Sequence, residues 1–149
     1  MKDDRLKIPV DPDYTSALGL AVYAFAGLEW NAIRCCERLE AGSIDALMDR
    51  TAGRVADTLL RLTRSIPASE TQRDIQRAAS DFRAFVGTRN NLMHAKPGVD
   101  QDGRQRLFRD GDQWTIDEMN AVADAFGECG QRLAKCLVED LPHSSSTGG

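Results

Sequence analysis

The sequence predicts an all-α fold: an up-and-down bundle of four to five helices with a small β-hairpin before the last helix. Three observations support this prediction. Apolar residues recur at helical spacing over several long stretches. Two of these stretches begin with the residue pattern of an N-terminal helix cap. The chain has 149 residues, of which 42% are hydrophobic, and this is enough to bury the core of one domain without disulfides.

The first long helix is expected over residues 13–41, where Gly42 ends it. Residues 1–12 are expected to form an irregular arm, because Pro9 and Pro12 block an earlier helix. Apolar residues occupy nearly the whole circumference of this helix rather than one stripe. In so small a domain, we expect a second protein surface to cover part of it.

The middle of the chain predicts two further helical stretches. The first covers residues 43–66, is broken near Gly53 and is ended by Pro67. Ser69 then begins a long third helix as its N-cap, with Gln72 three residues later as in a capping box. This helix is expected to end near residues 96–98.

A change of period follows the third helix and predicts a β-hairpin. Asp110-Gly111-Asp112 lies between two short runs, residues 106–109 and 113–115, and Asp-Gly between such runs is typical of a hairpin turn. Two strands alone would be marginally stable.

The last helix is predicted to begin after Thr115, which forms a second capping box with Glu118, and to end near Glu139. The folded domain is therefore expected to span residues 13–139. Residues 140–149 are expected to be a mobile tail, because they carry few core-forming side chains.

The four cysteines predict neither a disulfide nor a metal site. Cys35 and Cys36 are adjacent, and Cys129 and Cys136 lie seven residues apart on one helical face. Neither spacing is that of a zinc motif. We expect all four to be small buried apolar residues, and no bound metal.

No apolar run approaches the roughly 18 residues that a membrane span requires. The first residues also lack the apolar stretch of a signal peptide. We therefore expect no membrane association and a cytoplasmic location.

The charge is unevenly distributed. The net charge is −4, which argues against coating nucleic acid through bulk positive charge. Residues 83–109, however, contain six basic and two acidic residues, whereas residues 110–140 contain eight acidic and two basic ones. These are either two solvated faces or an anion-attracting patch on an acidic body. The candidate substrate-binding residues in this patch are Lys96, Arg83, Arg104 and Arg106.

Arg89 is anomalous on the third helix. One stripe of this helix is apolar and consists of Ile75, Phe82, Val86 and Met93. Arg89 falls in the middle of that stripe, where an unpaired charge is costly. Its structural explanations are an ion pair, for which Glu29 on the first helix is the candidate, or a head group that reaches solvent.

His94 is the single candidate for proton transfer near neutral pH from an ordered element, because the other histidine, His143, lies in the expected tail. An ideal helix places His94 roughly 140° from Arg89, so the two do not converge within one straight helix. Asn90 lies one turn before His94 and is placed to orient the imidazole ring. A site assembled from two copies of the chain avoids this conflict.

The segment from Arg89 to His94 resembles the signature of the HEPN domain superfamily. In that family an arginine is followed by a polar residue and then by a histidine near the end of a long helix, with four to six residues between the arginine and the histidine. Arg89, Asn90 and His94 fit this pattern with four intervening residues. The largely apolar first helix and the compact helical domain also fit this family. The resemblance covers roughly residues 13–139.

The resemblance implies a metal-independent endoribonuclease without a cofactor, of the kind found in bacterial toxin-antitoxin or phage-defence systems. It implies a homodimer through the first and motif helices, with RNA as substrate and an antitoxin protein as a possible partner. His94 would transfer the proton, Arg89 would stabilise the phosphate charge, and Asn90 would orient His94 or touch phosphate. The RNA 2′-hydroxyl would be the nucleophile, so DNA should resist.

Two other hypotheses stay open. The first is a non-catalytic HEPN-like dimer that binds RNA, a nucleotide or a protein partner. The second is a helical dimer in which the short motif is accidental. Tyr23 and Trp30 could stack on bases, but core or interface packing is the commoner role of aromatic residues at helical positions.

Overall fold

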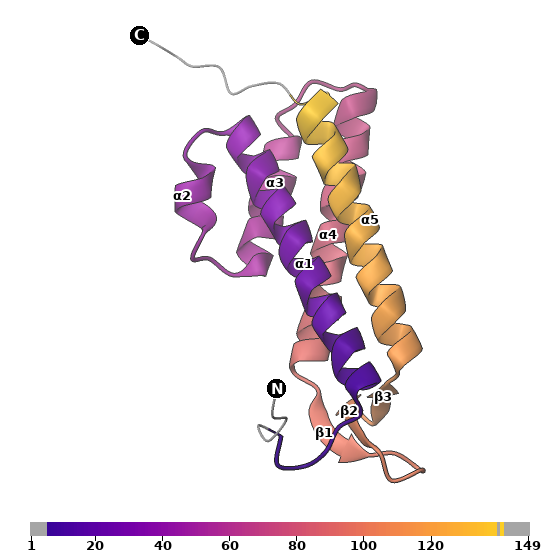
Figure 1. Ribbon diagram of the computed structural model, residues 1–149. Coiled ribbons are helices and arrows are strands. Elements are labelled where there is room, and N and C mark those ends of the chain that lie inside the picture. The colour runs from indigo at the N-terminus through magenta and orange to yellow at the C-terminus, as the bar shows by residue number, and fades with distance from the viewer. Residues whose placement is uncertain (1–5, 140, 142–149) are drawn as a thin grey trace.

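Two long helices, α1 (Pro12–Leu39) and α5 (Ile116–Glu139), lie side by side along most of the molecule, and the remaining elements are arranged around them (Figure 1). The computed structural model describes residues 6–139 and 141. Within these residues the elements are α1 (Pro12–Leu39), α2 (Ser43–Leu47), α3 (Ala52–Thr63), α4 (Glu70–Met93), β1 (Lys96–Val99), β2 (Gln105–Arg109), β3 (Asp112–Trp114) and α5 (Ile116–Glu139). The predicted predominance of helices is confirmed.

The boundaries of the first three helices differ slightly from the prediction. Pro12 does not block α1 but begins it, because the fixed φ of proline suits the first position of a helix. Gly42 has a φ of 94°, a left-handed conformation that turns the chain directly into α2. The break in the second stretch precedes Gly53, because Thr51 caps α3 by accepting a hydrogen bond from the Arg54 amide at 3.2 Å.

The two predicted capping boxes differ in how completely they form. At α5, Thr115 and Glu118 exchange hydrogen bonds of 3.0 and 3.1 Å, so this box is confirmed. At α4, Ser69 accepts a hydrogen bond from the Gln72 amide at 3.1 Å, which confirms the cap. The Gln72 side chain instead donates to the Thr63 carbonyl at 3.3 Å and so joins α4 to the end of α3.

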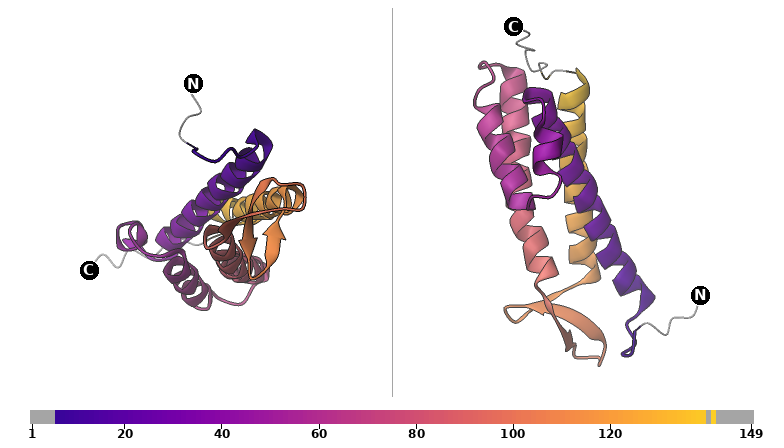
Figure 2. Two further views of the ribbon diagram at one scale, coloured as in Figure 1. Left: turned by 90° about the horizontal axis from the view of Figure 1, so that it is seen from below. Right: turned by 90° about the vertical axis from the view of Figure 1, so that its left-hand side faces the viewer.

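The sheet has three strands, not the predicted two, and closes one end of the helical bundle (Figure 2). The strands are antiparallel in the order β1-β2-β3. Asp110 and Gly111 form the predicted turn, with φ of 52° and 83°. The extra strand is β1, because α4 ends at Met93 rather than near residues 96–98.

Pro97 and Gly98 explain why the sequence does not predict β1, since both are unfavourable residues in a strand interior. An edge strand tolerates proline, and β1 pairs on one side only. Gly98 lies under the ring of Phe108, where a Cβ atom would come within 2.7 Å of the ring. The glycine is therefore required by packing between β1 and β2.

The core consists of two clusters. The larger one lies among the helices and contains the aromatic rings of Phe25, Phe82 and Phe126, with Phe25 and Phe126 meeting edge to face at 5.2 Å. The smaller one lies where α1, α4 and α5 meet the sheet, and includes Tyr14 and Met119. Leu141 is buried in the larger cluster, which corrects its assignment to a mobile tail; the rest of residues 140–149 and residues 1–5 lie outside the described chain.

The four cysteines are buried and form no disulfide, as predicted. Burial raises the pKa of the Cys35 and Cys36 thiols to about 12 and that of Cys129 to about 11. No cluster of metal-ligating side chains occurs in the described part of the chain. None of its helices is both long enough and apolar enough to cross a membrane.

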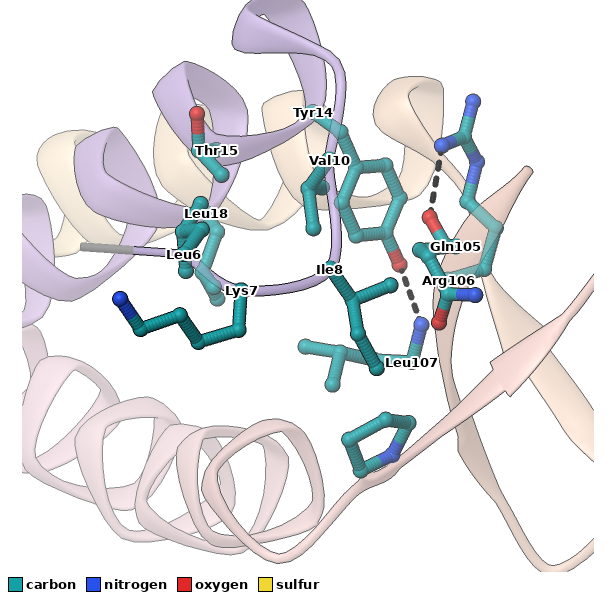
Figure 3. Close-up of a pocket in the computed structure, with 11 residues that line it drawn as sticks. Leu6, Lys7, Ile8, Val10, Tyr14, Thr15, Leu18, Gln105, Arg106 and Leu107 are labelled. Carbon is teal, nitrogen blue, oxygen red and sulfur yellow. Dashed lines mark hydrogen bonds between the residues drawn. The ribbon is translucent and has the colours of Figure 1, made fainter. Parts of the chain in front are cut away.

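The Tyr14 hydroxyl attaches the sheet to the first turn of α1. It accepts a hydrogen bond from the Leu107 amide at 2.9 Å and donates one to the Trp114 carbonyl at 2.6 Å, so it contacts both β2 and β3. Figure 3 shows the bond to Leu107. The Tyr14 side chain is itself buried, and its ring belongs to the smaller core cluster.

Replacing Tyr14 with phenylalanine should therefore destabilise the protein by about 2 kcal/mol, because the Leu107 amide and the Trp114 carbonyl each lose their partner in a part-buried site. Urea unfolding followed by circular dichroism measures this. The matched control is Tyr23→Phe, at a residue that is 80% exposed, which should leave the unfolding midpoint in place. Equal stability of the two variants would contradict the structural role of the hydroxyl.

Candidate functional site

Arg89 points to the inner side of α4 and is half-buried. Its guanidinium carbon lies 4.8 Å from the centre of the Phe25 ring on α1, a cation-π contact. The Nε atom of Arg89 is buried and has no hydrogen-bond partner within the described residues. A buried donor without an acceptor is unusual in a folded protein, which makes Arg89 a candidate functional residue.

The predicted ion pair between Arg89 and Glu29 does not form. No nitrogen of the Arg89 guanidinium lies within 4.0 Å of a carboxylate oxygen of Glu29, although the charge of Arg89 acts on Glu29. Desolvation raises the pKa of the Glu29 carboxyl, and the positive charge of Arg89 lowers it in part. Phe25 rather than Glu29 therefore packs against Arg89.

Asn90 and His94 are exposed, in contrast to Arg89. His94 is the C-cap of α4, and its backbone amide donates to the Asn90 carbonyl at 2.9 Å. The Asn90 side chain makes no hydrogen bond to the imidazole among the described residues. The predicted orienting contact is thus absent within one chain, and the three motif side chains do not form one hydrogen-bonded cluster there.

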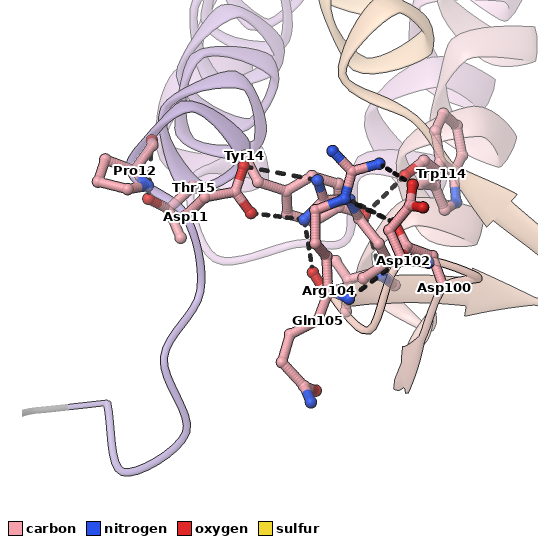
Figure 4. Close-up of polar contacts among 11 residues, drawn as sticks. Asp11, Pro12, Tyr14, Thr15, Asp100, Asp102, Arg104, Gln105 and Trp114 are labelled. Carbon is pink, nitrogen blue, oxygen red and sulfur yellow. Dashed lines mark hydrogen bonds and ion pairs between the residues drawn. The ribbon is translucent and has the colours of Figure 1, made fainter.

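Arg106, predicted to bind substrate, has a structural position instead. Its side chain is 4% exposed, pairs with Asp11 at 2.5 Å and with Asp100 at 3.8 Å, and lies 4.4 Å from the centre of the Tyr14 ring. Figure 4 shows Asp11, Tyr14 and Asp100 gathered around this position. These contacts join the arm before α1 to the β1-β2 turn and leave little surface for a phosphate.

The other three predicted substrate-binding residues do not form one surface. Arg104 is held by Asp100 at 3.1 Å and Asp102 at 3.0 Å in the β1-β2 turn. Arg83 pairs with Asp57 of α3 at 3.5 Å, and lies about 16 Å along the helix axis from His94. Lys96 alone is exposed beside the motif, two residues after His94. The excess positive charge of this segment is therefore partly neutralised locally.

An apolar groove of about 440 Å³ lies beneath the arm that precedes α1 (Figure 3). Leu6, Ile8 and Val10 of the arm cover one side, and Leu18 and Leu107 line the other. None of the motif residues lines this groove. The groove is therefore separate from the motif residues.

A second hollow of about 500 Å³ lies where the end of α4, the β2-β3 hairpin and the start of α5 meet. Its polar lining includes Asn91, Arg109, Gln113 and Glu118, and its aromatic lining is Trp114. The sequence singled out none of these five as site residues. The signal available was the position of Asn91 inside the motif, three residues before His94.

No protein-family model matches this chain, and searches of curated protein sequences and of solved structures likewise return no match.

The ion pairs of Arg106 should make the stability of the protein depend on pH in the acidic range. The hydrogen bond from Arg106 lowers the pKa of Asp11, and the backbone amide of Arg104 lowers the pKa of Asp100. An unfolded aspartate titrates at about 3.9. Because the folded pKa values lie below it, this contribution is complete above about pH 4 and is lost as the pH falls through the folded values.

The expected result is a melting temperature that falls as the pH is lowered below about 4, with a smaller fall in Asp11→Asn. The exposed substitution Asp49→Asn is the matched control and should keep the wild-type slope. Calorimetry across this range measures both. A slope in Asp11→Asn as steep as in the wild type would exclude the ion pair as its cause.

Proposed function

We propose that this protein is a metal-independent endoribonuclease of the HEPN type, acting through Arg89, Asn90 and His94. The observation that carries the proposal is Arg89: a half-buried guanidinium whose Nε has no partner, placed five residues before the only histidine in residues 6–139. A structural arginine on an apolar stripe would be expected to have a carboxylate partner. Arg89 does not have one within the described chain.

The chemistry requires few groups, because RNA carries its own nucleophile. The 2′-hydroxyl attacks the adjacent phosphate, and His94 transfers the proton. Arg89 stabilises the negative charge that accumulates on the phosphate oxygens, for which its planar fork is suited. The products are a 2′,3′-cyclic phosphate and a 5′-hydroxyl. Asn90 contacts phosphate or the imidazole of the partner chain.

A homodimer would bring Arg89 of one chain close to His94 of the other. Arg89 is half-buried against α1 and His94 is exposed at the end of α4, so each needs a complement from elsewhere. The outer face of α1 carries exposed apolar side chains, among them Leu20, Tyr23 and Trp30. Met93, within the motif segment, is 55% exposed. This surface supports association through α1 and α4.

The biological setting we propose is a bacterial toxin-antitoxin or phage-defence system, and it rests on the resemblance of the motif alone. An antitoxin would act by covering the exposed His94 and Lys96.

The second candidate is a non-catalytic dimer that binds RNA, a nucleotide or a protein. It is favoured by the net charge of −4 and by the ion pairs that occupy Arg83, Arg104 and Arg106. It predicts binding without cleavage, so the cleavage assay separates the two candidates.

The purified protein should cleave single-stranded RNA in the presence of a chelator and leave DNA of the same sequence intact. Arg89→Ala and His94→Ala should each lower the rate at least about 100-fold, the usual effect of losing a charge stabiliser or a general acid-base group. Arg83→Ala, on the same helix, is the matched control and should cleave at nearly the wild-type rate. RNA cleavage that persists in both motif variants would exclude this site.

The composite site predicts complementation between inactive variants. The protein should run at twice the 16.4 kDa chain mass in solution. In an equal mixture of Arg89→Ala and His94→Ala chains, half of the dimers are mixed and one of their two sites has both side chains. About a quarter of the wild-type activity should therefore return, by the symmetry of the dimer. A monomer, or a mixture as inactive as its components, would contradict the shared site.

A further inference from the structure

The hollow between α4, the β2-β3 hairpin and α5 lies next to the motif. Asn91 lines it, and His94 is one helical turn further along the chain. Residues three apart on a helix lie roughly 5–6 Å from each other at their Cβ atoms. Viewed along the axis of α4, the position of His94 is rotated about 40° from that of Asn90. The position of Asn91 is rotated about 60° further in the same direction. His94 therefore separates the side of α4 that carries Asn90 from the side that lines the hollow.

Arg109 supplies the strongest donor in this hollow. Its Nε atom is buried and has no hydrogen-bond partner among the described residues. The nearest carboxylate is that of Asp110, at 3.8 Å, which is beyond hydrogen-bonding distance. Such a donor can be satisfied by an acceptor on a ligand.

The charge of the lining argues against a phosphate in this hollow. Asp110, Asp112 and Glu118 contribute three carboxylates against the single positive charge of Arg109. An anion would be repelled, whereas a neutral group with both acceptors and donors would be accepted. A nucleobase is such a group, and the hollow, at about 500 Å³, is in the size range of small-ligand pockets.

Guanine matches the lining better than the other bases. Its O6 and N7 atoms are adjacent acceptors, the pair that an arginine guanidinium contacts best. Its N1–H and N2 amino groups are adjacent donors, which suit a carboxylate such as Glu118. The capping hydrogen bond from the Thr115 amide, at 3.0 Å, already fixes the Glu118 carboxylate in place. Trp114 is the aromatic residue of the lining, and a base can stack on such a ring.

We propose that the hollow lined by Asn91, Arg109, Trp114 and Glu118 is a guanine-binding subsite beside the cleavage site. The inference rests on the proposed function, since it makes the subsite the source of a cleavage preference next to guanosine. In this arrangement the scissile phosphate would lie at His94 and a neighbouring base would occupy the hollow. Binding of the base does not itself require cleavage, so the two proposals can be tested separately.

The test is titration of the isotope-labelled full chain with GMP, AMP, CMP and UMP, followed by amide and side-chain NMR. GMP should shift the signals of Asn91, Gln113 and Trp114 and bind about tenfold more tightly than the other three, the discrimination expected of one bidentate arginine contact. Arg109→Met should weaken GMP binding by a similar factor. Arg104→Met, in the neighbouring turn, is the matched control and should bind GMP normally.

Three results would overturn the subsite: equal affinity for the four nucleotides, signal changes confined to other parts of the chain, or unaltered GMP binding in Arg109→Met. If Arg109→Met does not fold, Asn91→Ala provides the same comparison. GMP selectivity without RNA cleavage would keep the subsite and reject the nuclease. RNA cleavage without GMP selectivity would do the reverse.

Discussion

The side chain of Tyr14 holds the helical bundle and the sheet in one arrangement. Its hydroxyl bonds to β2 and β3, and its ring lies against the guanidinium of Arg106, which is paired with the arm before α1. Only two residues separate α4 from β1, so the sheet also sets the direction in which α4 ends. Both the exposed His94 and the hollow around Arg109 lie at this junction, and their geometry depends on it.

Local signals in the sequence predicted most of the fold. The exchange between Thr115 and Glu118, the Asp110-Gly111 turn and the Ser69 cap each involve residues at most three positions apart, so their geometry follows from the sequence itself. The strand β1 could not be predicted in this way. Pro97 and Gly98 disfavour a strand locally, and the ring of Phe108, which explains the glycine, is ten residues away.

The sequence predicted which residues of the candidate site are unusual, but not which side chains they contact. Arg89 stood out because it interrupts an apolar stripe, and the structure gives it Phe25 as a neighbour rather than Glu29. The sequence predicted Arg106 as a substrate contact because it did not reveal the carboxylate that pairs with it. That carboxylate belongs to Asp11, which lies 95 positions earlier in the chain. A positively charged segment therefore reveals an anion-binding surface only after its internal ion pairs have been identified.

The buried cysteines have a practical consequence for studying this fold. Thiolates react with alkylating reagents, and the raised pKa values of Cys35, Cys36 and Cys129 keep these thiols protonated as well as inaccessible. Their labelling rate in the native protein consequently reports how often the core opens. Because Cys35 contacts the Leu133 carbonyl and Cys129 contacts the Ala78 carbonyl, the two residues monitor separation of α5 from α1 and from α4 independently.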